Sequence, residues 1–327
     1  MTQIPTIDDV VEARGRLQGQ AVVTPLLESP ALNARVKGRV LIKPENLQRT
    51  GSFKFRGAWN CISRLTAETA RGGVVAYSSG NHAQGVAAAA ALMKLPALIV
   101  MPVDTPEIKK ANTRSYGAEV VTYDRVRENR EEIAQRIAKE RGAVIVPPFE
   151  HPQIIAGQGT TGLELVEQAA ERGARLDAVL APVSGGGLIA GIALAVKDRS
   201  PATQIHSVEP EGFDDHARSL ISGKRERNER AAGSICDALL SPEPGALTFA
   251  VNQSRLSSGL VVSEAEVRRA VAFAFQHLKL VIEPGGAVGL AAVLSGKIAT
   301  EDRTIALIAS GGNVDPALFA EILLEKA

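Results

Sequence analysis

Short apolar runs rich in β-branched residues alternate along this chain with longer segments of helical periodicity. The runs predicted to form strands cover residues 73–77, 97–101, 118–123, 178–181 and 304–309. Segments 163–172 and 265–275 place apolar residues three and four positions apart, with charged residues on the opposite face. That pattern is typical of a surface helix packed on a sheet. The alternation predicts an α/β fold with parallel strands.

The composition is that of an ordinary globular protein. With 327 residues and 45% hydrophobic content, the chain can bury a large core and divide into two domains. Its 37 basic and 36 acidic residues give a formal net charge of +1, so no global field attracts nucleic acid or an anionic membrane. We therefore expect small molecules as partners, and neither nucleic acid nor a membrane.

The N-terminus and the cysteines bear on cellular location. The first residues are acidic and lack an apolar core, and the longest apolar run, 86–93, is too short to span a bilayer. The chain is therefore expected in the cytoplasm. Cys61 and Cys236 lie far apart in the sequence, which predicts two small buried residues rather than a disulfide framework or a zinc site.

Segment 43–58 presents one lysine among turn-forming residues. Lys54 follows a glycine and two hydroxyl residues, and it lies beside Phe53 and Arg56. An amine held in this way can form a Schiff base with a carbonyl cofactor. Because an isolated lysine is usually a surface residue, this interpretation depends on its neighbours and on several loops elsewhere in the chain.

Glycine-rich loops are the second sign of a cofactor. The segments predicted to serve it are 78–85, 157–160, 184–188 and 310–313. The best phosphate cradle leads from a predicted strand into an apolar helical segment, where backbone N–H groups and a helix dipole can hold an anion. Its residues are Ser184, Gly185, Gly186, Gly187 and Leu188.

A dinucleotide site is the alternative for this cradle. Gly185, Gly187 and Gly191, with Glu209 ending a strand about 20 residues later, partly match the fingerprint of such a site. The spacing is imperfect, and the unit lies mid-chain without a second nucleotide-binding half. A further alternative is that this loop is a tight strand-to-helix turn that binds no ligand. The lysine segment favours a carbonyl cofactor over both alternatives.

The segment around residues 78–82 predicts a substrate loop. Ser78, Ser79 and Asn81 lie at a strand-to-helix turn, where exposed N–H groups and short polar side chains can hold the α-carboxylate of an amino acid. Alternatively, Ser78 caps the alanine-rich helix that follows. His82 either contacts the substrate or makes a structural hydrogen bond beneath the loop.

Together these motifs resemble the serine/threonine dehydratase and serine racemase group of fold-type-II pyridoxal-phosphate enzymes, over nearly the whole chain and in the family's order. The resemblance implies a tryptophan synthase β-like fold, in which each of two α/β domains is a mostly parallel sheet flanked by helices. Residues 1–72 and 149–327 would form the large cofactor-binding domain. Residues 73–148 would form a small mobile domain that carries the substrate loop, with the cofactor in the cleft between them.

The resemblance also implies roles around pyridoxal 5'-phosphate. Lys54 would carry the cofactor as a Schiff base, with Phe53 against its ring, Asn81 near the ring hydroxyl and Ser310 facing the ring nitrogen. Arg56 is assigned a structural or ionic role. A serine hydroxyl is too weak an acid to protonate the ring fully, so long-lived carbanions are disfavoured and loss of a β-leaving group is favoured. The alternative for the segment at Ser310 is a turn without a ligand.

The activity implied is that of an ammonia-lyase, or dehydratase. L-threonine would give 2-oxobutanoate and L-serine pyruvate, each with ammonia, after Lys54 removes the Cα proton and the β-hydroxyl leaves. Arg127 lies where some relatives place an arginine facing the active site, so 3-hydroxyaspartate is an alternative substrate. The other interpretation of Arg127 is an exposed residue near the start of a helix.

Serine racemase with dehydratase side activity is a further alternative, because Ser79 matches the second acid/base of serine racemases. Dehydratases also carry this serine, so it does not discriminate. Outside this class, a nicotinamide-dependent oxidoreductase and a non-catalytic binding protein on the same scaffold remain alternatives, and Lys54 argues against both.

A metal site and a dimer complete what the resemblance implies. Segment 207–215 resembles the one where related enzymes hold Mg²⁺ or Ca²⁺, with Glu209 and Asp215 as carboxylate ligands and Phe213 as a carbonyl ligand. The ion would be structural, and the alternative is a solvated acidic loop. The family is usually homodimeric.

Overall fold

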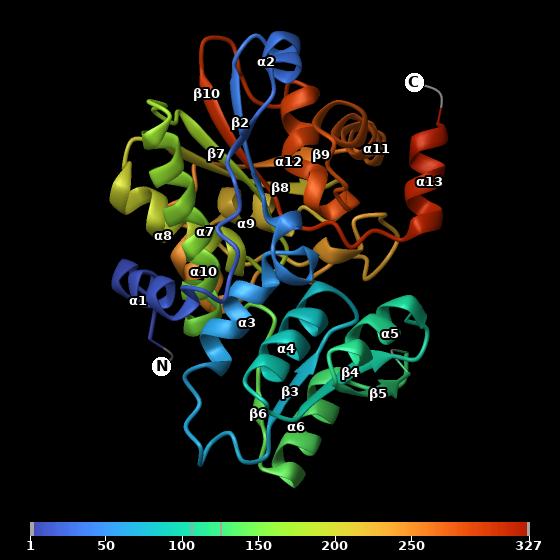
Figure 1. Ribbon diagram of the computed structural model, residues 1–327. Helices are drawn as coiled ribbons and strands as arrows, with labels where there is room; N and C mark the ends of the chain where they lie inside the picture. Colours follow the sequence, from blue (N-terminus) through green and yellow to red (C-terminus); the bar gives the residue numbers. More distant parts are fainter. Residues whose placement is uncertain (1–2, 106, 125, 326–327) are drawn as a thin grey trace.

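The computed structural model describes residues 3–105, 107–124 and 126–325. Its strands form two sheets, a six-stranded sheet in the order β1-β2-β10-β7-β8-β9 and a four-stranded sheet in the order β5-β4-β3-β6 (Figure 1). The strand pairs are parallel except β1 with β2. This arrangement confirms the predicted α/β class.

The strands of the larger sheet come from both ends of the chain, and those of the smaller sheet come from one continuous stretch. In the larger sheet they are β1 (Leu27–Glu28), β2 (Arg39–Pro44), β7 (Ala178–Pro182), β8 (Gln204–Pro210), β9 (Ser258–Val262) and β10 (Thr304–Ala309). In the smaller sheet they are β3 (Val74–Tyr77), β4 (Ala97–Pro102), β5 (Glu119–Tyr123) and β6 (Val144–Ile145). Each strand predicted from the sequence is present.

Helices cover both sheets (Figure 1). Around the larger sheet they are α1 (Ile7–Leu17), α2 (Pro30–Val36), α3 (Lys54–Ile62), α7 (Pro152–Glu171), α8 (Gly187–Arg199), α9 (Asp215–Ser222), α10 (Ala246–Asn252), α11 (Glu264–Phe273), α12 (Pro284–Leu294) and α13 (Pro316–Leu324). Around the smaller sheet they are α4 (Asn81–Leu92), α5 (Glu107–Ser115) and α6 (Arg130–Arg141). Short 3-10 turns form η1 (Glu45–Leu47), η2 (Arg49–Gly51) and η3 (Asp237–Leu239), and one π-helical turn forms η4 (Ala274–Leu278).

Burial explains why the central strands lack an amphipathic alternation. Every residue of β7 is buried, as is every residue of β10 after Thr304. A parallel sheet with helices on both faces excludes water from each face, so its strands are continuous apolar runs. The predicted helical segment 163–172 lies in α7, and 265–275 spans α11 and the start of η4.

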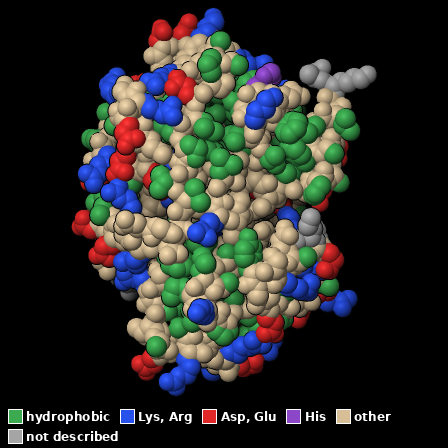
Figure 2. Space-filling model, viewed as in Figure 1, with side chains coloured by type: hydrophobic (Ala, Val, Ile, Leu, Met, Phe, Trp, Pro, Cys, Tyr) green, Lys and Arg blue, Asp and Glu red, His purple; other side chains and the backbone are tan. Residues whose placement is uncertain are grey.

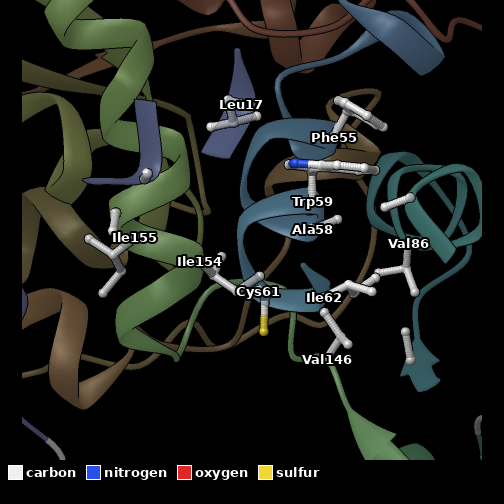
Figure 3. Packing of buried hydrophobic residues seen from close by; sticks show 14 of the residues in the cluster. Leu17, Phe55, Ala58, Trp59, Cys61, Ile62, Val86, Val146, Ile154 and Ile155 are labelled. Atoms are coloured by element: carbon white, nitrogen blue, oxygen red, sulfur yellow. The ribbon is translucent and has the colours of Figure 1, made fainter. Parts of the chain in front are cut away.

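The helix α3 connects the two halves of the molecule. Its side chains Phe55 and Trp59 pack in one cluster with Val86 of α4 and Ile154 of α7 (Figure 3). Full burial of an apolar side chain of this size contributes roughly 1.5–3 kcal/mol. Because Lys54 is the first residue of α3, this packing fixes the backbone that carries the lysine.

One face of the molecule carries charges of both signs (Figure 2). Acidic and basic side chains are interspersed on the face shown in Figure 2, in keeping with the formal net charge of +1. Within the part of the chain that the structure describes, no helix is long and apolar enough to cross a membrane.

Candidate active site

One cavity of about 280 Å³ lies where loops from the two sheets meet. It is lined by the start of α3, the loop after β3, the loop after β7 and the residue after β10. The carboxyl ends of parallel strands are the usual place for ligands in such sheets. The predicted residues that line it are Phe53, Lys54, Ser78, Ser79, Asn81, His82, Ser184, Gly185, Gly186, Gly187, Leu188 and Ser310.

Lys54 is half-buried at this cavity. Its Nζ donates a hydrogen bond to the carbonyl of Pro148 at 2.8 Å and lies 5.1 Å from the ring centre of Phe53. Burial lowers the pKa of this amine to about 8, because removal of water disfavours the charged form. A substantial fraction of the amine is therefore neutral, and thus nucleophilic, near physiological pH.

The glycine loop forms an anion site at the N-terminus of α8. Gly186, the N-cap residue, has φ 96° and no side-chain cap, so the first N–H groups of the helix are left for a ligand. A Cβ on Gly185 would lie 2.4 Å from the ring of Phe149. The Oγ1 of Thr248 donates to the carbonyl of Gly185 at 2.5 Å. Positions 185 and 186 therefore require glycine, and the free N–H donors at the start of α8 suit a phosphate.

Ser184 and Ser310 are held by further contacts at the same cavity. The Oγ of Ser184 donates to the Oγ of Ser241 at 2.8 Å and accepts from its backbone N–H at 3.1 Å. Ser310, which is 5% exposed, accepts through its carbonyl from the N–H of Phe53 at 3.1 Å. This hydrogen bond holds Ser310, the residue after β10, next to Phe53, the residue before Lys54.

The loop after β3 leaves the start of α4 open to a ligand. The N-cap residue is Gly80, with no side-chain cap, so the alternative in which Ser78 caps this helix is wrong. The Oγ of Ser78 instead accepts from the N–H of Gly80 at 3.3 Å. The uncapped N–H groups of α4, next to two serines, form a site that suits a carboxylate.

His82 makes a structural hydrogen bond beneath this loop. It is 2% exposed, and its Nε2 lies 2.8 Å from the carbonyl of Val146. Burial, and secondarily the charge of Lys54, lower the pKa of His82 to about 3. The ring is therefore neutral, and its Nε2–H donates to that carbonyl. A contact of His82 with substrate stays a prediction.

Segment 157–160 does not take part in the cavity, contrary to expectation. It lies inside α7, and its glycines permit close helix packing. A Cβ on Gly157 would lie 2.7 Å from the carbonyl of Arg56, and one on Gly159 would lie 2.8 Å from the carbonyl of Gly191. A Cβ on Gly191 would lie 2.3 Å from the carbonyl of Ile155. The glycines of α7, and Gly191 from the dinucleotide alternative, thus serve packing.

The arginine that lines the cavity is Arg130, whereas the sequence had pointed to Arg127. The Arg127 side chain is 84% exposed, and its Nε is 3.7 Å from Asp124. Arg130, in the first turn of α6, lines the cavity with its Cζ 5.5 Å from the ring centre of Tyr77. No local pattern marks Arg130, since its place depends on the orientation of α6. A substrate contact for Arg127 stays a prediction.

Three more charged residues line the cavity and were not expected there. Lys109 of α5 pairs with Asp237 of η3 at 2.5 Å, which links the two sides of the cavity. Glu283, the N-cap residue of α12, accepts a hydrogen bond from Asn81 at 2.6 Å. In the sequence, Glu283 comes just before Pro-Gly-Gly at the start of a helix. This pattern could have marked it as an N-cap residue.

The predicted cation ligands are buried side by side. Glu209 is 0% and Asp215 1% exposed. Burial, with the nearby Asp215 carboxylate, raises the pKa of Glu209 well above its usual range, and burial raises that of Asp215 to about 7. Oδ2 of Asp215 has no hydrogen-bond partner among the described residues. A cation would satisfy this oxygen, whereas the two oxygens of Glu209 already accept from the backbone N–H groups of His216 at 2.9 Å and Ala217 at 2.7 Å.

Comparison with known proteins agrees with this geometry. The family described as pyridoxal-phosphate dependent enzyme matches residues 17–311, and the chain belongs to it. An L-threo-3-hydroxyaspartate ammonia-lyase from Pseudomonas sp is 43% identical over 321 residues, covering 98% of this chain and 99% of the relative. A serine racemase from Schizosaccharomyces pombe is 38% identical over 320 residues, or 98% of each chain.

A solved structure extends the likeness to three dimensions. A threonine deaminase from T.th. superposes with a TM-score of 0.90 at 45% identity, over 95% of this chain and 99% of that one. The fold-type-II resemblance is thus confirmed. The chain is an enzyme of the pyridoxal-phosphate-dependent ammonia-lyase type.

Proposed function

We propose that this enzyme deaminates small β-hydroxy L-amino acids, with L-threonine and L-serine as substrates and 2-oxobutanoate and pyruvate as products. The observation that carries the proposal is the meeting of Lys54, the glycine loop and the uncapped start of α4 at one cavity. That cavity offers an amine, a phosphate cradle and a carboxylate site, which are the three parts that such a reaction needs.

Each part has a defined task in this proposal. Bound pyridoxal phosphate withdraws electrons from Cα of an amino acid, so that its proton can be removed. Lys54, with its pKa lowered to about 8, is the base that takes that proton. The start of α4, with Ser78 and Ser79, holds the α-carboxylate in place. The start of α8 would hold the phosphate, and Ser310 would face the ring nitrogen.

A second candidate substrate is 3-hydroxyaspartate, and Arg130 favours it. No carboxylate pairs with Arg130 among the described residues, whereas Lys109 at the same cavity is already paired with Asp237. A guanidinium at the cavity wall suits the second carboxylate of a dicarboxylic amino acid. A relative of this chain is named for that substrate.

The substrate is tested by measuring keto-acid release from L-serine, D-serine, L-threonine and the 3-hydroxyaspartate stereoisomers. If Arg130 binds a second carboxylate, Arg130→Leu should lower kcat/KM for L-threo-3-hydroxyaspartate by about 10-fold to 100-fold, the value of one charge-assisted hydrogen bond. It should leave kcat/KM for L-threonine within about threefold, because L-threonine has no second carboxylate.

Arg127→Leu is the matched control for this variant. A selective loss of kcat/KM for L-threo-3-hydroxyaspartate in Arg127→Leu, and not in Arg130→Leu, would mean that Arg127 binds the second carboxylate, as predicted from the sequence. No release of keto acid from any of these amino acids would refute the ammonia-lyase proposal. Chiral analysis of the remaining serine tests the racemase alternative, for which Ser79 at the cavity is the second acid/base.

We also propose that Glu209, Asp215 and the carbonyl of Phe213 bind a structural Mg²⁺ or Ca²⁺. The burial of both carboxylates, the effect of Asp215 in raising the pKa of Glu209, and the unpaired Oδ2 of Asp215 support it. Dialysis against EDTA should lower the Tm of the holoenzyme by several degrees, and added Mg²⁺ or Ca²⁺ should restore it. An unchanged Tm in metal-free buffer, confirmed by elemental analysis, would contradict the site.

The remaining expectations are parts of the same proposal. Residues 73–148 are proposed as a small mobile domain that closes over substrate, supported by the separate sheet that β3 to β6 form. A homodimer is also proposed. Hydrophobic side chains gather near α11 and α13 on the face shown in Figure 2, where Phe275 is 43% exposed. The cytoplasmic location stays a prediction.

A further inference from the structure

Glu283 is a buried carboxylate at the cavity, and the proposed reaction gives this residue no role. It is 4% exposed, and its Oε1 accepts a hydrogen bond from Nδ2 of Asn81 at 2.6 Å. A Cβ on Gly311 would lie 2.2 Å from that oxygen. The glycine after Ser310 is therefore required if the carboxylate is to reach Asn81.

A second contact fixes the other end of the Asn81 amide. Its Oδ1 accepts from Nδ2 of Asn313 at 2.7 Å, and the same Nδ2 donates to the backbone carbonyl of Thr50 at 2.8 Å. A backbone carbonyl can only accept, so Asn313 must turn its NH₂ group toward Thr50. Asn81 must then turn its oxygen toward Asn313 and its nitrogen toward Glu283.

This chain of hydrogen bonds determines which end of the Asn81 amide, the oxygen or the nitrogen, faces Glu283. The two ends of the amide have nearly the same shape but opposite hydrogen-bonding character. Glu283 uses one N–H of Asn81, and the amide nitrogen retains a second one. In the flipped orientation, the oxygen of Asn81 would lie against the ionised carboxylate of Glu283, which is repulsive. Burial, and secondarily the charge of Asp237, raise the pKa of Glu283 to about 7, so this repulsion acts fully above that pH.

We propose that Glu283 is a positioning residue, which holds the Asn81 amide so that it offers the bound cofactor an N–H donor instead of a carbonyl. The acceptor is an anionic oxygen of pyridoxal phosphate, which an N–H stabilises and a carbonyl repels. The proposal rests on the cofactor of the family and not on the substrate. The proposal can therefore be tested without any turnover of substrate.

The test is the visible absorption of the holoenzyme as a function of pH, without substrate. Ionisation of the cofactor's phenolic oxygen changes this absorption, so the midpoint reports how well the protein stabilises the anion. In Glu283→Gln the carboxylate, which only accepts, is replaced by an amide that can turn either an N–H or an oxygen toward Asn81, so Asn313 alone remains to orient the Asn81 amide. We expect the midpoint to rise by about one pH unit or more, as expected for a lost hydrogen bond to a charged group.

The direction of the shift separates this role from a simple charge effect. Removal of a negative charge near the cofactor would by itself stabilise the anion and lower the midpoint. Asp237→Asn, which removes the other cavity carboxylate without a contact to Asn81, should therefore leave the midpoint unchanged or lower it. An unchanged or lowered midpoint in Glu283→Gln would overturn the proposal.

A variant at the far end of the chain of hydrogen bonds gives an independent test. Asn313→Ala removes the donor that faces Asn81 and Thr50 without adding a charge, and it should also raise the midpoint. The double variant should shift the midpoint no further than the larger single variant, because both act through the same amide. Additive shifts would show that the residues act separately. If Glu283→Gln does not bind the cofactor, Asn313→Ala alone decides: a raised midpoint supports the proposal and an unchanged one overturns it.

Discussion

Replacement of Lys54 by alanine should abolish both the visible absorption of bound cofactor and the release of keto acid. Lys54 is the cavity lysine whose amine lacks a carboxylate partner among the described residues, and burial lowers its pKa to about 8. Its loss removes both the attachment point and the base. We expect kcat/KM to fall by at least about 10³-fold, within the range for a group that transfers a proton in the reaction.

Two further measurements make this prediction specific. Borohydride reduction of the wild-type holoenzyme, followed by peptide mass analysis, should place the cofactor on the peptide that contains Lys54. Lys109→Ala, which removes the other cavity lysine, should keep the absorption band. A Lys54→Ala protein that still turns over substrate, or a cofactor found on another peptide, would contradict the assignment.

The largest effect on stability is expected at Arg56, which lies two residues beyond the lysine. Its guanidinium is 1% exposed and donates to Glu45 through Nε at 2.7 Å and to Glu164 through Nη1 at 2.6 Å. Lys43 joins the same cluster at 2.6 Å from Glu164. Burial alone would lower the pKa of Arg56, but the two carboxylates raise it. The ionic role expected for Arg56 is confirmed.

Arg56→Met should lower the free energy of unfolding by about 3–5 kcal/mol, because Glu45 would keep a buried charge without its main partner. Urea denaturation measures this change. Arg39→Met is the matched control: its pair with Glu28 is 3.0 Å long but partly exposed, and such a pair contributes about 0–1 kcal/mol. Adding Glu45→Gln to Arg56→Met should recover part of the loss. Equal losses in Arg56→Met and Arg39→Met would refute the argument.

The features that the sequence predicted correctly are those encoded over short distances. An apolar run followed by glycine or serine marks the end of a strand, and parallel strands bring such ends to the same edge of a sheet. Thus the loops at Ser78, Ser184 and Ser310 meet Lys54 at one cavity. Local composition was enough for these loops because each is built from consecutive residues.

Prediction was wrong or incomplete where the structure depends on how helices meet. Glycines at 157–160 look like a loop in the sequence, but a glycine also permits close contact between helices, and only the packing of α7 on α3 and α8 distinguishes the two cases. Arg127 and Arg130 are three positions apart, but only Arg130, in the first turn of α6, lines the cavity. Glu283 reaches Asn81 across 202 positions of sequence.

The position of β10 has a consequence for synthesis of the chain. This strand, at residues 304–309, lies between β2 and β7 in the larger sheet. While the ribosome is still making the C-terminal region, β2 and β7 each have an unpaired edge, and the cavity lacks the residue after β10. Exposed edges of this kind invite association with other chains. The newly made chain therefore completes neither the larger sheet nor the cavity until residues 304–309 have left the ribosome, whatever the supply of the vitamin-derived cofactor.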